Sequence, residues 1–238
     1  MQILVRKLLH RISTKQTIGL RAYSTNKFID VGQPTPASHP QEGEITPGKG
    51  AEEYNSRRKR LLDLLPENSV AILAVAPVKM MTDVVPYTYR QDADYLYITG
   101  CEQPGGLAVL SHECGSCMFM LETSPHWSTF VQDVNWKGPV AGVEAALETF
   151  KAEKAYPMRK IHEILPDMIG RSSKLFHNKE AAAQTLTDLK AFQKADYYGK
   201  VKNLSKLTDV LQWVKSPAEL KLMRESASIA CQALFYTR

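Results

Sequence analysis

The stretch AEEYNSRRKRLLDLLPENSVAILAVA, residues 51–76, decides the fold class. Its first part, Ala51 to Leu65, has acidic residues at its start and basic residues further on, which suits the dipole of a helix. Apolar side chains recur there at helical spacing, and Pro66 ends the helix. Ser69 to Ala76 is a short apolar run of the kind found in strands that are buried on both faces. A helix followed by a buried strand indicates an α/β protein.

The rest of the chain continues the alternation of strands and helices. We expect strands at Tyr95–Thr99, Leu107–Leu110, Met118–Leu121 and Lys174–His177, a hairpin turn at Gly115 and Ser116, and helices at 143–153, 159–169 and 180–194. Strands that alternate with helices predict a mixed β-sheet flanked by helices. The sequence contains no internal repeat.

The composition is close to that of globular proteins. Of 238 residues, 44% are hydrophobic and 23% are charged, both near the usual averages. The longest apolar run, Val70 to Ala76, has seven residues. A membrane-spanning helix needs about 20, so no membrane span is expected. Four cysteines are too few for a secreted disulfide scaffold of this length, which favours a reducing compartment: Cys101, Cys114, Cys117 and Cys231.

The net charge of +5 comes from the amino terminus. Residues 1–23 hold five basic residues and no acidic one. Taking these five from the 30 basic residues of the chain leaves 25, which equals the 25 acidic residues. Because the remainder is neutral, we expect no nucleic-acid partner.

Residues 1–23 interleave apolar and basic side chains as an organelle transit peptide does, without the unbroken apolar core of a secretory signal. The surroundings of Tyr23 and Ser24 are similar to a mitochondrial processing site, with cleavage between these two residues. Mitochondrial import is favoured over chloroplast import, and the alternative is a disordered basic tail with no import role. Residues 24–50 contain four prolines and few large apolar side chains, which predicts a disordered linker.

The last segment of the sequence begins a well-specified helix. Ser216 to Glu219 form a capping box with Pro217 at the first helical position. Apolar residues then recur at helical spacing as far as Leu234. Two alternatives stay open: the apolar stripe packs back on the body, or the helix begins a further domain.

Three groups of residues are candidates for chemical sites. Cys114 and Cys117 form a single CxxC, for which a plain turn is favoured over a metal or redox site because no second pair exists. Asp92 and Asp94 would share one side of an extended segment, where two carboxylates are weak ligands for a divalent ion. The favoured interpretation is that one caps a turn and the other pairs with Arg90. The histidines show no spacing typical of ligands, so surface or core positions are favoured.

Trp127 and Trp136 lie in a stretch rich in turn and polar residues. Such tryptophans either serve as exposed recognition side chains or cover the core, and the residues alone favour the core. No phosphate-binding loop, dinucleotide motif or nucleophile elbow is present in the sequence. The residues alone therefore predict no complete active site.

The segment YTYRQDADYLYITG, residues 87–100, is similar to the signature of the aminopeptidase P amino-terminal domain. DVNWKGP, residues 133–139, is similar to the Trp-containing loop of that family. WVKSPAELKLMRESASIACQAL, residues 213–234, resembles the linker and first helix of the family's catalytic domain. The resemblance covers about residues 44–234. Together with the transit-like segment it points to the mitochondrial branch, aminopeptidase P3 or intermediate-cleaving peptidase, and to its plant-type members.

The resemblance implies a fold and an organisation. Residues 51–205 would form the amino-terminal domain, a mixed sheet with helices like that of creatinase and prolidase, and residues 206–238 would be the linker and first helix of a pita-bread catalytic domain. That domain carries five Asp, His and Glu ligands for two manganese ions. The sequence has no positions that match these ligands, so no catalytic residue, metal ligand or bound cofactor is expected in this chain.

The resemblance also implies roles for single residues. Trp136 matches the loop tryptophan that approaches the active site of a neighbouring subunit, which implies a substrate-lining role and an oligomer. The signature residues Tyr89, Arg90, Asp94 and Gly100 are interpreted as structural.

Two hypotheses of function follow. In the first, the chain is a truncated form of a manganese aminopeptidase of the mitochondrial matrix, inert alone. The full-length enzyme would remove an amino-terminal residue from X-Pro peptides or from proteins whose presequence has been cleaved, with a metal-bridging hydroxide as nucleophile. In the second, the chain is an inert interaction module that pairs with full-length subunits.

Overall fold

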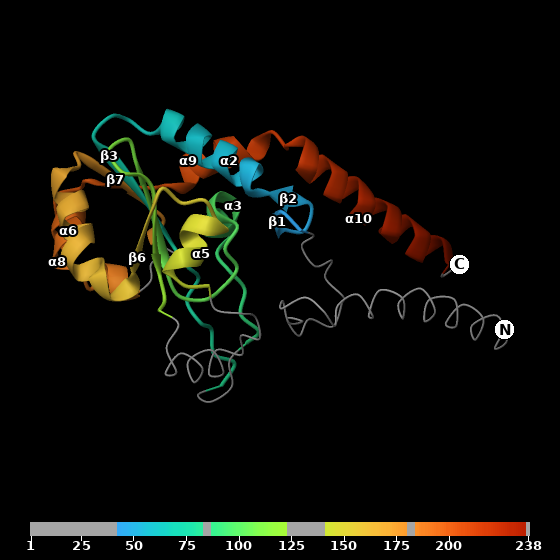
Figure 1. The fold of residues 1–238 in the computed structure, drawn as a ribbon, viewed down its shortest axis with the longest axis horizontal. Helices are drawn as coiled ribbons and strands as arrows, with labels where there is room; N and C mark the ends of the chain where they lie inside the picture. The colour runs from blue at the N-terminus through green and yellow to red at the C-terminus, as the bar shows by residue number, and fades with distance from the viewer. Residues whose placement is uncertain (1–41, 83–86, 123–140, 180–183, 237–238) are drawn as a thin grey trace.

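The computed structural model describes residues 42–82, 87–122, 141–179 and 184–236. The described chain is built around a six-stranded mixed sheet with helices on both faces (Figure 1). This arrangement confirms the fold class expected from the sequence. The transit-like segment 1–23 and its cleavage site lie outside the described residues.

The sheet has the strand order β6-β5-β4-β3-β7-β8. β4 is antiparallel to both of its neighbours, and the other adjacent pairs are parallel. In the centre of β3, Ile72 is aligned with Val109 on one side and with His177 on the other. The strands are β3 (Ser69–Ala74), β4 (Leu107–Ser111), β5 (Gly115–Met120), β6 (Lys154–Pro157), β7 (Lys174–His177) and β8 (Val201–Lys202).

The buried strand β3 separates two cores because successive side chains of a strand point to opposite faces. Ala71 and Leu73 enter the first core, under helices α2 (Ala51–Leu64), α3 (Ala93–Thr99), α5 (Val143–Glu148) and α9 (Ser205–Trp213). Val70 and Ile72 enter the second core, under α6 (Ile161–Arg171), α7 (Gln184–Thr187) and α8 (Lys190–Tyr197). The continuous apolar run that begins at Ser69 is thus explained by the burial of β3 on both faces.

The end of the expected linker is folded, which is a correction. β1 (Glu44–Thr46) and β2 (Lys49–Gly50) form a small antiparallel hairpin directly before α2. Thr46 is buried and its hydroxyl lies 2.5 Å from the hydroxyl of Tyr54 on α2. This contact with α2 gives a polar, glycine-rich stretch a fixed place that its composition did not predict.

The expected strand at Tyr95–Thr99 is wrong, because this segment forms helix α3. The side chain of Asp92 accepts a hydrogen bond from the backbone N–H of Tyr95 (2.9 Å) and so caps the start of the helix. Tyr95 and Ile98, three positions apart, are both buried in the first core, as helical periodicity requires. The aromatic and β-branched residues that favour a strand are therefore outweighed by a capping residue and a buried helical face.

Several expected boundaries also shift. Residues 180–183 of the helix expected at 180–194 lie outside the described residues. The rest forms two helices, α7 and α8, because Leu189 turns into the second core with an extended backbone. The helix expected at 143–153 ends at Glu148, and Lys151 has a positive φ of 52° that no helix accepts. The hairpin turn precedes Gly115, which already belongs to β5. The helix expected at 159–169 begins with a 3-10 turn, η1 (Met158–Lys160), and continues as α6.

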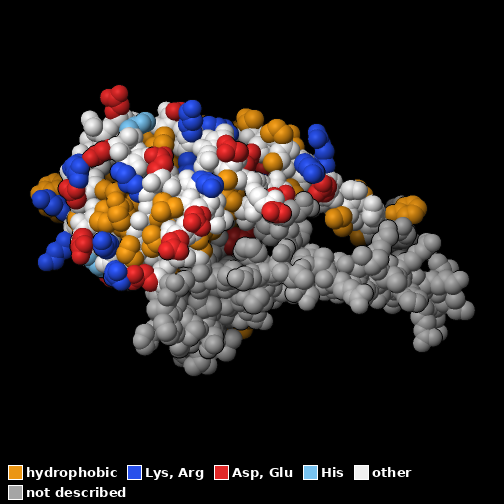
Figure 2. All heavy atoms as spheres, viewed as in Figure 1, with side chains coloured by type: hydrophobic (Ala, Val, Ile, Leu, Met, Phe, Trp, Pro, Cys, Tyr) orange, Lys and Arg blue, Asp and Glu red, His pale blue; other side chains and the backbone are white. Residues whose placement is uncertain are grey.

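Helix α10 (Pro217–Tyr236) extends away from the rest of the chain (Figure 1). Its capping box is confirmed, since the Ser216 N–H donates to Glu219 Oε2 (2.8 Å) and the Glu219 N–H donates to Ser216 Oγ (3.2 Å). In the face shown in Figure 2, acidic and basic side chains are interspersed over the body. No helix among the described residues is long and apolar enough to cross a membrane.

Candidate functional site

The signature segment 87–100 meets the end of strand β3 through the side chain of Gln91. Gln91 Oε1 accepts hydrogen bonds from the backbone N–H of Ala76 (2.9 Å), the backbone N–H of Asp92 (2.9 Å) and the hydroxyl of Tyr89 (3.0 Å). Gln91 is only 8% exposed, so these donors depend on it for satisfaction. The arrangement joins the carboxyl end of β3 to the start of α3.

A second glutamine extends this connection. Gln91 Nε2 donates to the backbone carbonyl of Gln103 (2.8 Å). The Gln103 side chain then holds both backbone groups of Ala141, accepting from its N–H (2.6 Å) and donating to its carbonyl (3.1 Å). Ala141 is the residue at which the described chain resumes after 122. Neither glutamine was expected from the sequence to have a role, although Gln91 lies inside the signature.

Tyr89 and Arg90 lie differently although they are adjacent. The Tyr89 hydroxyl shares its one proton between Gln91 Oε1 (3.0 Å) and the carbonyl of Ala76 (3.2 Å). Burial raises the pKa of Tyr89, with a smaller contribution from nearby Cys101 and Asp92, so the phenol keeps its proton and acts as a donor. Arg90 is exposed. The position of Tyr89 supports a structural role in docking the segment on β3.

Asp92 and Asp94 are engaged separately at the beginning of α3. Asp92 caps α3, which agrees with the expectation that one of the two carboxylates acts as a cap. Asp94 accepts a hydrogen bond from Gln212 Nε2 on α9 (2.9 Å), and no ion pair joins it to Arg90 among the described residues. Burial raises the pKa of Asp94, opposed by hydrogen bonds from Thr208 and Gln212. The pairing of the second carboxylate with Arg90 is therefore wrong.

Gly100 ends α3 in the left-handed conformation, with φ of 74°, and its N–H donates to the carbonyl of Leu96 (2.8 Å). A Cβ at this position would lie 2.7 Å from Ile45 Cγ2 and 2.9 Å from the ring of Tyr54. Both the backbone angle and the lack of space therefore require glycine.

Cys114 and Cys117 lie where the second core meets the hairpin of β4 and β5. The Cys114 N–H donates to Ser111 Oγ (3.1 Å), and the same hydroxyl lies 3.0 Å from Cys114 Sγ. Burial raises the pKa of the Cys117 thiol to about 12, so it is not the thiolate that binds metals or exchanges disulfides. These contacts favour the plain turn.

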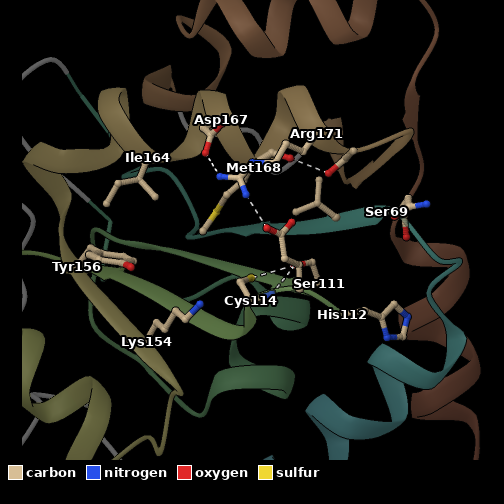
Figure 3. Close-up of a pocket in the computed structure, with 14 residues that line it drawn as sticks. Ser69, Ser111, His112, Cys114, Lys154, Tyr156, Ile164, Asp167, Met168 and Arg171 are labelled. Atoms are coloured by element: carbon tan, nitrogen blue, oxygen red, sulfur yellow. Dashed lines mark hydrogen bonds and ion pairs between the residues drawn. The ribbon is translucent and has the colours of Figure 1, made fainter.

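A cleft of about 280 Å³ opens beside this turn (Figure 3). It lies at the amino end of β3, whereas Gln91 bonds Ala76 just after the carboxyl end of that strand. Three charged groups of the cleft form ion pairs: Arg171 on α6 bonds Glu113 (2.6 Å) and also Asp167. Lys154 and Cys114 line the other side (Figure 3). Because Arg171 is shared between two carboxylates, the cleft does not present a free guanidinium to a ligand.

The remaining candidates from the sequence are the histidines and two tryptophans. His112 Nε2 lies 3.0 Å from the carbonyl of Leu65, and the buried His177 places Nδ1 2.9 Å from the carbonyl of Ile72. Both contacts are with the backbone, in agreement with the structural interpretation. Trp127 and Trp136 lie outside the described residues.

Comparison with known proteins shows which family this chain is similar to. Residues 54–176 match the family described as "Aminopeptidase P, N-terminal domain". The chain is 61% identical over 240 residues to intermediate cleaving peptidase 55, mitochondrial, of Arabidopsis thaliana, covering 100% of this chain and 48% of that protein. It is 29% identical over 238 residues to Xaa-Pro aminopeptidase 3 of Rattus norvegicus, covering 89% and 45%. The chain thus spans about half the length of the curated relatives that it matches.

Solved structures agree with this match. Aminopeptidase PepP of Pseudomonas aeruginosa superposes with a TM-score of 0.64 at 28% identity, over 77% of this chain and 43% of that chain. Icp55 of Saccharomyces cerevisiae superposes with a TM-score of 0.61 at 24% identity, over 76% and 41%, a likeness of fold alone. The chain therefore belongs to the aminopeptidase P family, and residues 54–176 are its amino-terminal domain.

Proposed function

We propose that this chain is the amino-terminal part of a metalloaminopeptidase of the mitochondrial matrix. The enzyme would remove an amino-terminal residue from X-Pro peptides or from proteins whose presequence has been cleaved. The observation that carries the proposal is the 61% identity, over the whole of this chain, to the Arabidopsis thaliana protein named intermediate cleaving peptidase 55, mitochondrial. The rat relative named Xaa-Pro aminopeptidase 3 supports the same class of reaction.

The described residues do not fit the pair of manganese ions that the resemblance implies. Within the part of the chain that the structure describes, no three His, Cys, Asp or Glu side chains are grouped so that they could hold a metal ion. Asp92 and Asp94 are engaged with the backbone of α3 and with Gln212. We therefore derive no catalytic step through manganese from these residues, and we assign the metal chemistry to a pita-bread domain. Of residues 206–238, expected to be its linker and first helix, those in α9 pack on the first core, and α10 is left for the role of that first helix.

The activity can be tested by complementation. The 238-residue chain and a chimera, in which residues 1–238 are continued by the unmatched remainder of the Arabidopsis thaliana relative, are assayed for release of the first residue of an X-Pro peptide with manganese. We expect activity from the chimera, abolished by a chelator, and none from the chain alone. Steady manganese-dependent release by the pure chain would overturn the assignment of the chemistry to the second domain. A folded, inactive chimera would overturn the proposed activity.

The same chimera tests the proposed role of Trp136 at the substrate site of a neighbouring subunit. Trp136→Ala should raise KM for the peptide while leaving the thermal unfolding temperature unchanged. Trp213→Ala is a matched control, because Trp213 is 84% exposed on α9. Equal effects of the two substitutions on KM would contradict the role.

The proposed location has an independent test. Residues 1–50 fused to a fluorescent protein should direct it to mitochondria, and amino-terminal sequencing of the imported fusion should show cleavage after Tyr23 or one residue beyond. A fusion that stays in the cytosol, or one recovered uncut, would contradict the transit peptide or its cleavage site respectively.

One observation favours a second candidate function, an interaction module. Both cores are closed by helices that belong to the described residues, so the amino-terminal domain can fold without catalytic residues. Such a chain could pair with full-length subunits of the same enzyme. Co-purification of the tagged chain with the chimera would support pairing, and elution of the mixture as two separate monomers would contradict it.

A further inference from the structure

Among the described residues, helix α10 meets the body near its beginning, through Glu219 and Leu222. Ser216, Ala218, Glu219 and Leu222 are partly buried, whereas every residue from 223 to 235 is exposed. At 1.5 Å per residue, this exposed part is about 20 Å long. Figure 1 shows it extending from the body beside the β1–β2 hairpin and α2. The direction of α10 therefore depends on a few contacts at its first two turns.

The first of these contacts is with Arg57, a buried residue of α2 that is only 3% exposed. Its guanidinium lies over the ring of Tyr97 at 4.0 Å and near the ring of Tyr54 at 5.1 Å. Nη1 donates to the carbonyl of Tyr97 (3.0 Å), while Nε (3.2 Å) and Nη2 (2.9 Å) donate to Glu53 Oε1. Arg57 is thus held in place by α2 and α3 before α10 is considered.

Glu219 connects this fixed cation to α10 by using both of its carboxylate oxygens. Oε1 lies 3.2 Å from Arg57 Nη2, and Oε2 accepts from the Ser216 N–H at the start of the helix. The Glu219 side chain is 16% exposed. Exposed ion pairs contribute little because two long side chains must be ordered to form them. Here Arg57 is already ordered by other partners, so only the Glu219 side chain loses conformational entropy when the ion pair forms.

The second contact is with the β1–β2 hairpin. Gly48, in the turn of the hairpin, faces Leu222 so closely that a Cβ would lie 2.9 Å from Leu222 Cδ2. Glu219 and Leu222 are three positions apart and so lie near one another on the helix surface. A charged contact at one turn and an apolar contact at the next fix both the position and the tilt of the helix.

Further charged side chains surround the contact between Arg57 and Glu219. Lys49 lies near it on the hairpin, and burial, followed by the proximity of Arg57, lowers the pKa of Lys49. Glu219, Glu53 and Glu102 act in the opposite direction on the same amine. Two cations thus face three carboxylates, and neutralising Glu219 removes the only one of the three that belongs to α10.

We propose that Arg57 and Glu219 are positioning residues that set the direction in which α10 leaves the amino-terminal domain, so that the helix is a rigid extension of the domain and not a hinged arm. The two residues would direct α10 in this chain whether or not it supports catalysis. A tilt of about 15° at the base would move the far end of the exposed helix by about 5 Å. Anything attached beyond α10 would therefore be placed by Arg57.

The chain offers a direct way to measure this direction. Cys231 on α10 is exposed, whereas Cys101, Cys114 and Cys117 are buried, so a thiol-reactive spin label attaches at Cys231. A second label goes to Tyr197→Cys on α8, where the side chain is 86% exposed. Pulsed electron spin resonance then gives the distribution of distances between body and helix. We expect one narrow distribution for this doubly labelled chain.

Glu219→Gln should broaden that distribution about twofold, as expected when a single orientation gives way to several. Glu225→Gln, an exposed change of the same kind further along α10, is the matched control and should leave the distribution unchanged. Arg57→Lys keeps the charge but loses the planar fork, so it should also broaden the distribution. Gly48→Ala should shift the mean distance, because Leu222 must move away from the new methyl group.

Two results would overturn the proposal. If the starting chain already gives a distribution as broad as that of Glu219→Gln, α10 is not held. If Glu219→Gln and Arg57→Lys lower the thermal unfolding temperature but leave the distribution narrow, the two residues stabilise the fold without directing the helix. Circular dichroism of each variant checks that α10 is still helical, and Glu219→Gln, which changes no residue of the body, keeps the test valid if Arg57→Lys fails to fold.

Discussion

Gly100 is the residue on which the end of α3 depends most. Its left-handed backbone costs a residue with a side chain about 1–2 kcal/mol, and a Cβ would also press on Ile45 and Tyr54. We expect Gly100→Ala to lower the free energy of unfolding by about 2–4 kcal/mol, measured by urea denaturation. Gly170→Ala is the control, since a Cβ at that helical position meets nothing within 4 Å. Similar losses for both variants would contradict the argument.

His177 makes the stability of the fold depend on pH. Burial lowers the pKa of His177 below its ordinary value of about 6.5, with the hydrogen bond to Ile72 and the charge of Asp92 opposing the shift. Between the two pKa values the unfolded chain holds a proton that the folded chain lacks, so stability rises with pH there and is lost as pH falls below about 6.5. His177→Gln should therefore reduce the loss of stability between about pH 7 and about pH 5.

The control for this pH effect is His162→Gln, because His162 is exposed on α6. The free energy of unfolding is measured by urea denaturation at each pH. The variants are compared by how steeply this free energy changes with pH, and not by its value at one pH. This choice matters because His177 also packs edge-on against Phe192, with ring centroids 5.5 Å apart, so its loss lowers stability at every pH. An unchanged slope in His177→Gln would show that other groups carry the acid sensitivity.

Among the helices and strands, the spacing of apolar residues predicted those that are determined by burial in a core. It missed those that depend on a single hydrogen bond or contact. β3, β7 and α2 follow from apolar runs and helical spacing, because burial on two faces or one leaves that pattern in the sequence. α3 does not, because one hydrogen bond to Asp92 outweighs residues that favour a strand. The contacts of Gln91 with Ala76 and of Gln103 with Ala141 join residues 15 and 38 positions apart, which no local pattern encodes.

Gln91 joins three parts of the chain, β3, α3 and the loop at Gln103, so its replacement should destabilise the fold. Gln91→Met has nearly the same length but removes the acceptor of three donors, two of them backbone N–H groups in a site that is 8% exposed. Unsatisfied buried donors are costly, so we expect a loss of about 2–4 kcal/mol in the free energy of unfolding. Hydrogen exchange at the Ala76 amide should quicken at the same time.

The matched control for Gln91 is Gln193→Met on α8. Gln193 donates a single exposed hydrogen bond to the carbonyl of Thr187 (2.9 Å), so its loss should change stability by about 0.5 kcal/mol or less. If the two variants lose the same small amount, water replaces the Gln91 side chain and the glutamine does not hold the segment.

For the whole molecule, the two cores and α10 differ in how well they are covered. The side chains of both cores are shielded by helices on each face of the sheet, whereas apolar residues of α10 lie in solvent, as the orange side chains on the projecting helix in Figure 2 also show. Those exposed by more than half are Met223, Ile229, Leu234 and Phe235. Of the two alternatives left by the sequence, packing back on the body is therefore wrong for this part of the helix.

An exposed apolar stripe of this kind promotes self-association. Deleting residues 215–238 should leave the two cores intact, with an unchanged circular dichroism transition for the body, and should raise the concentration at which light scattering detects aggregates. Ile229→Glu with Leu234→Glu is the matched variant that keeps the helix and removes two of its exposed apolar side chains. Both changes should act in the same direction, because each reduces the apolar surface in contact with water. A deletion that lowers the thermal unfolding temperature without improving solubility would instead mean that α10 is covered by the body in solution.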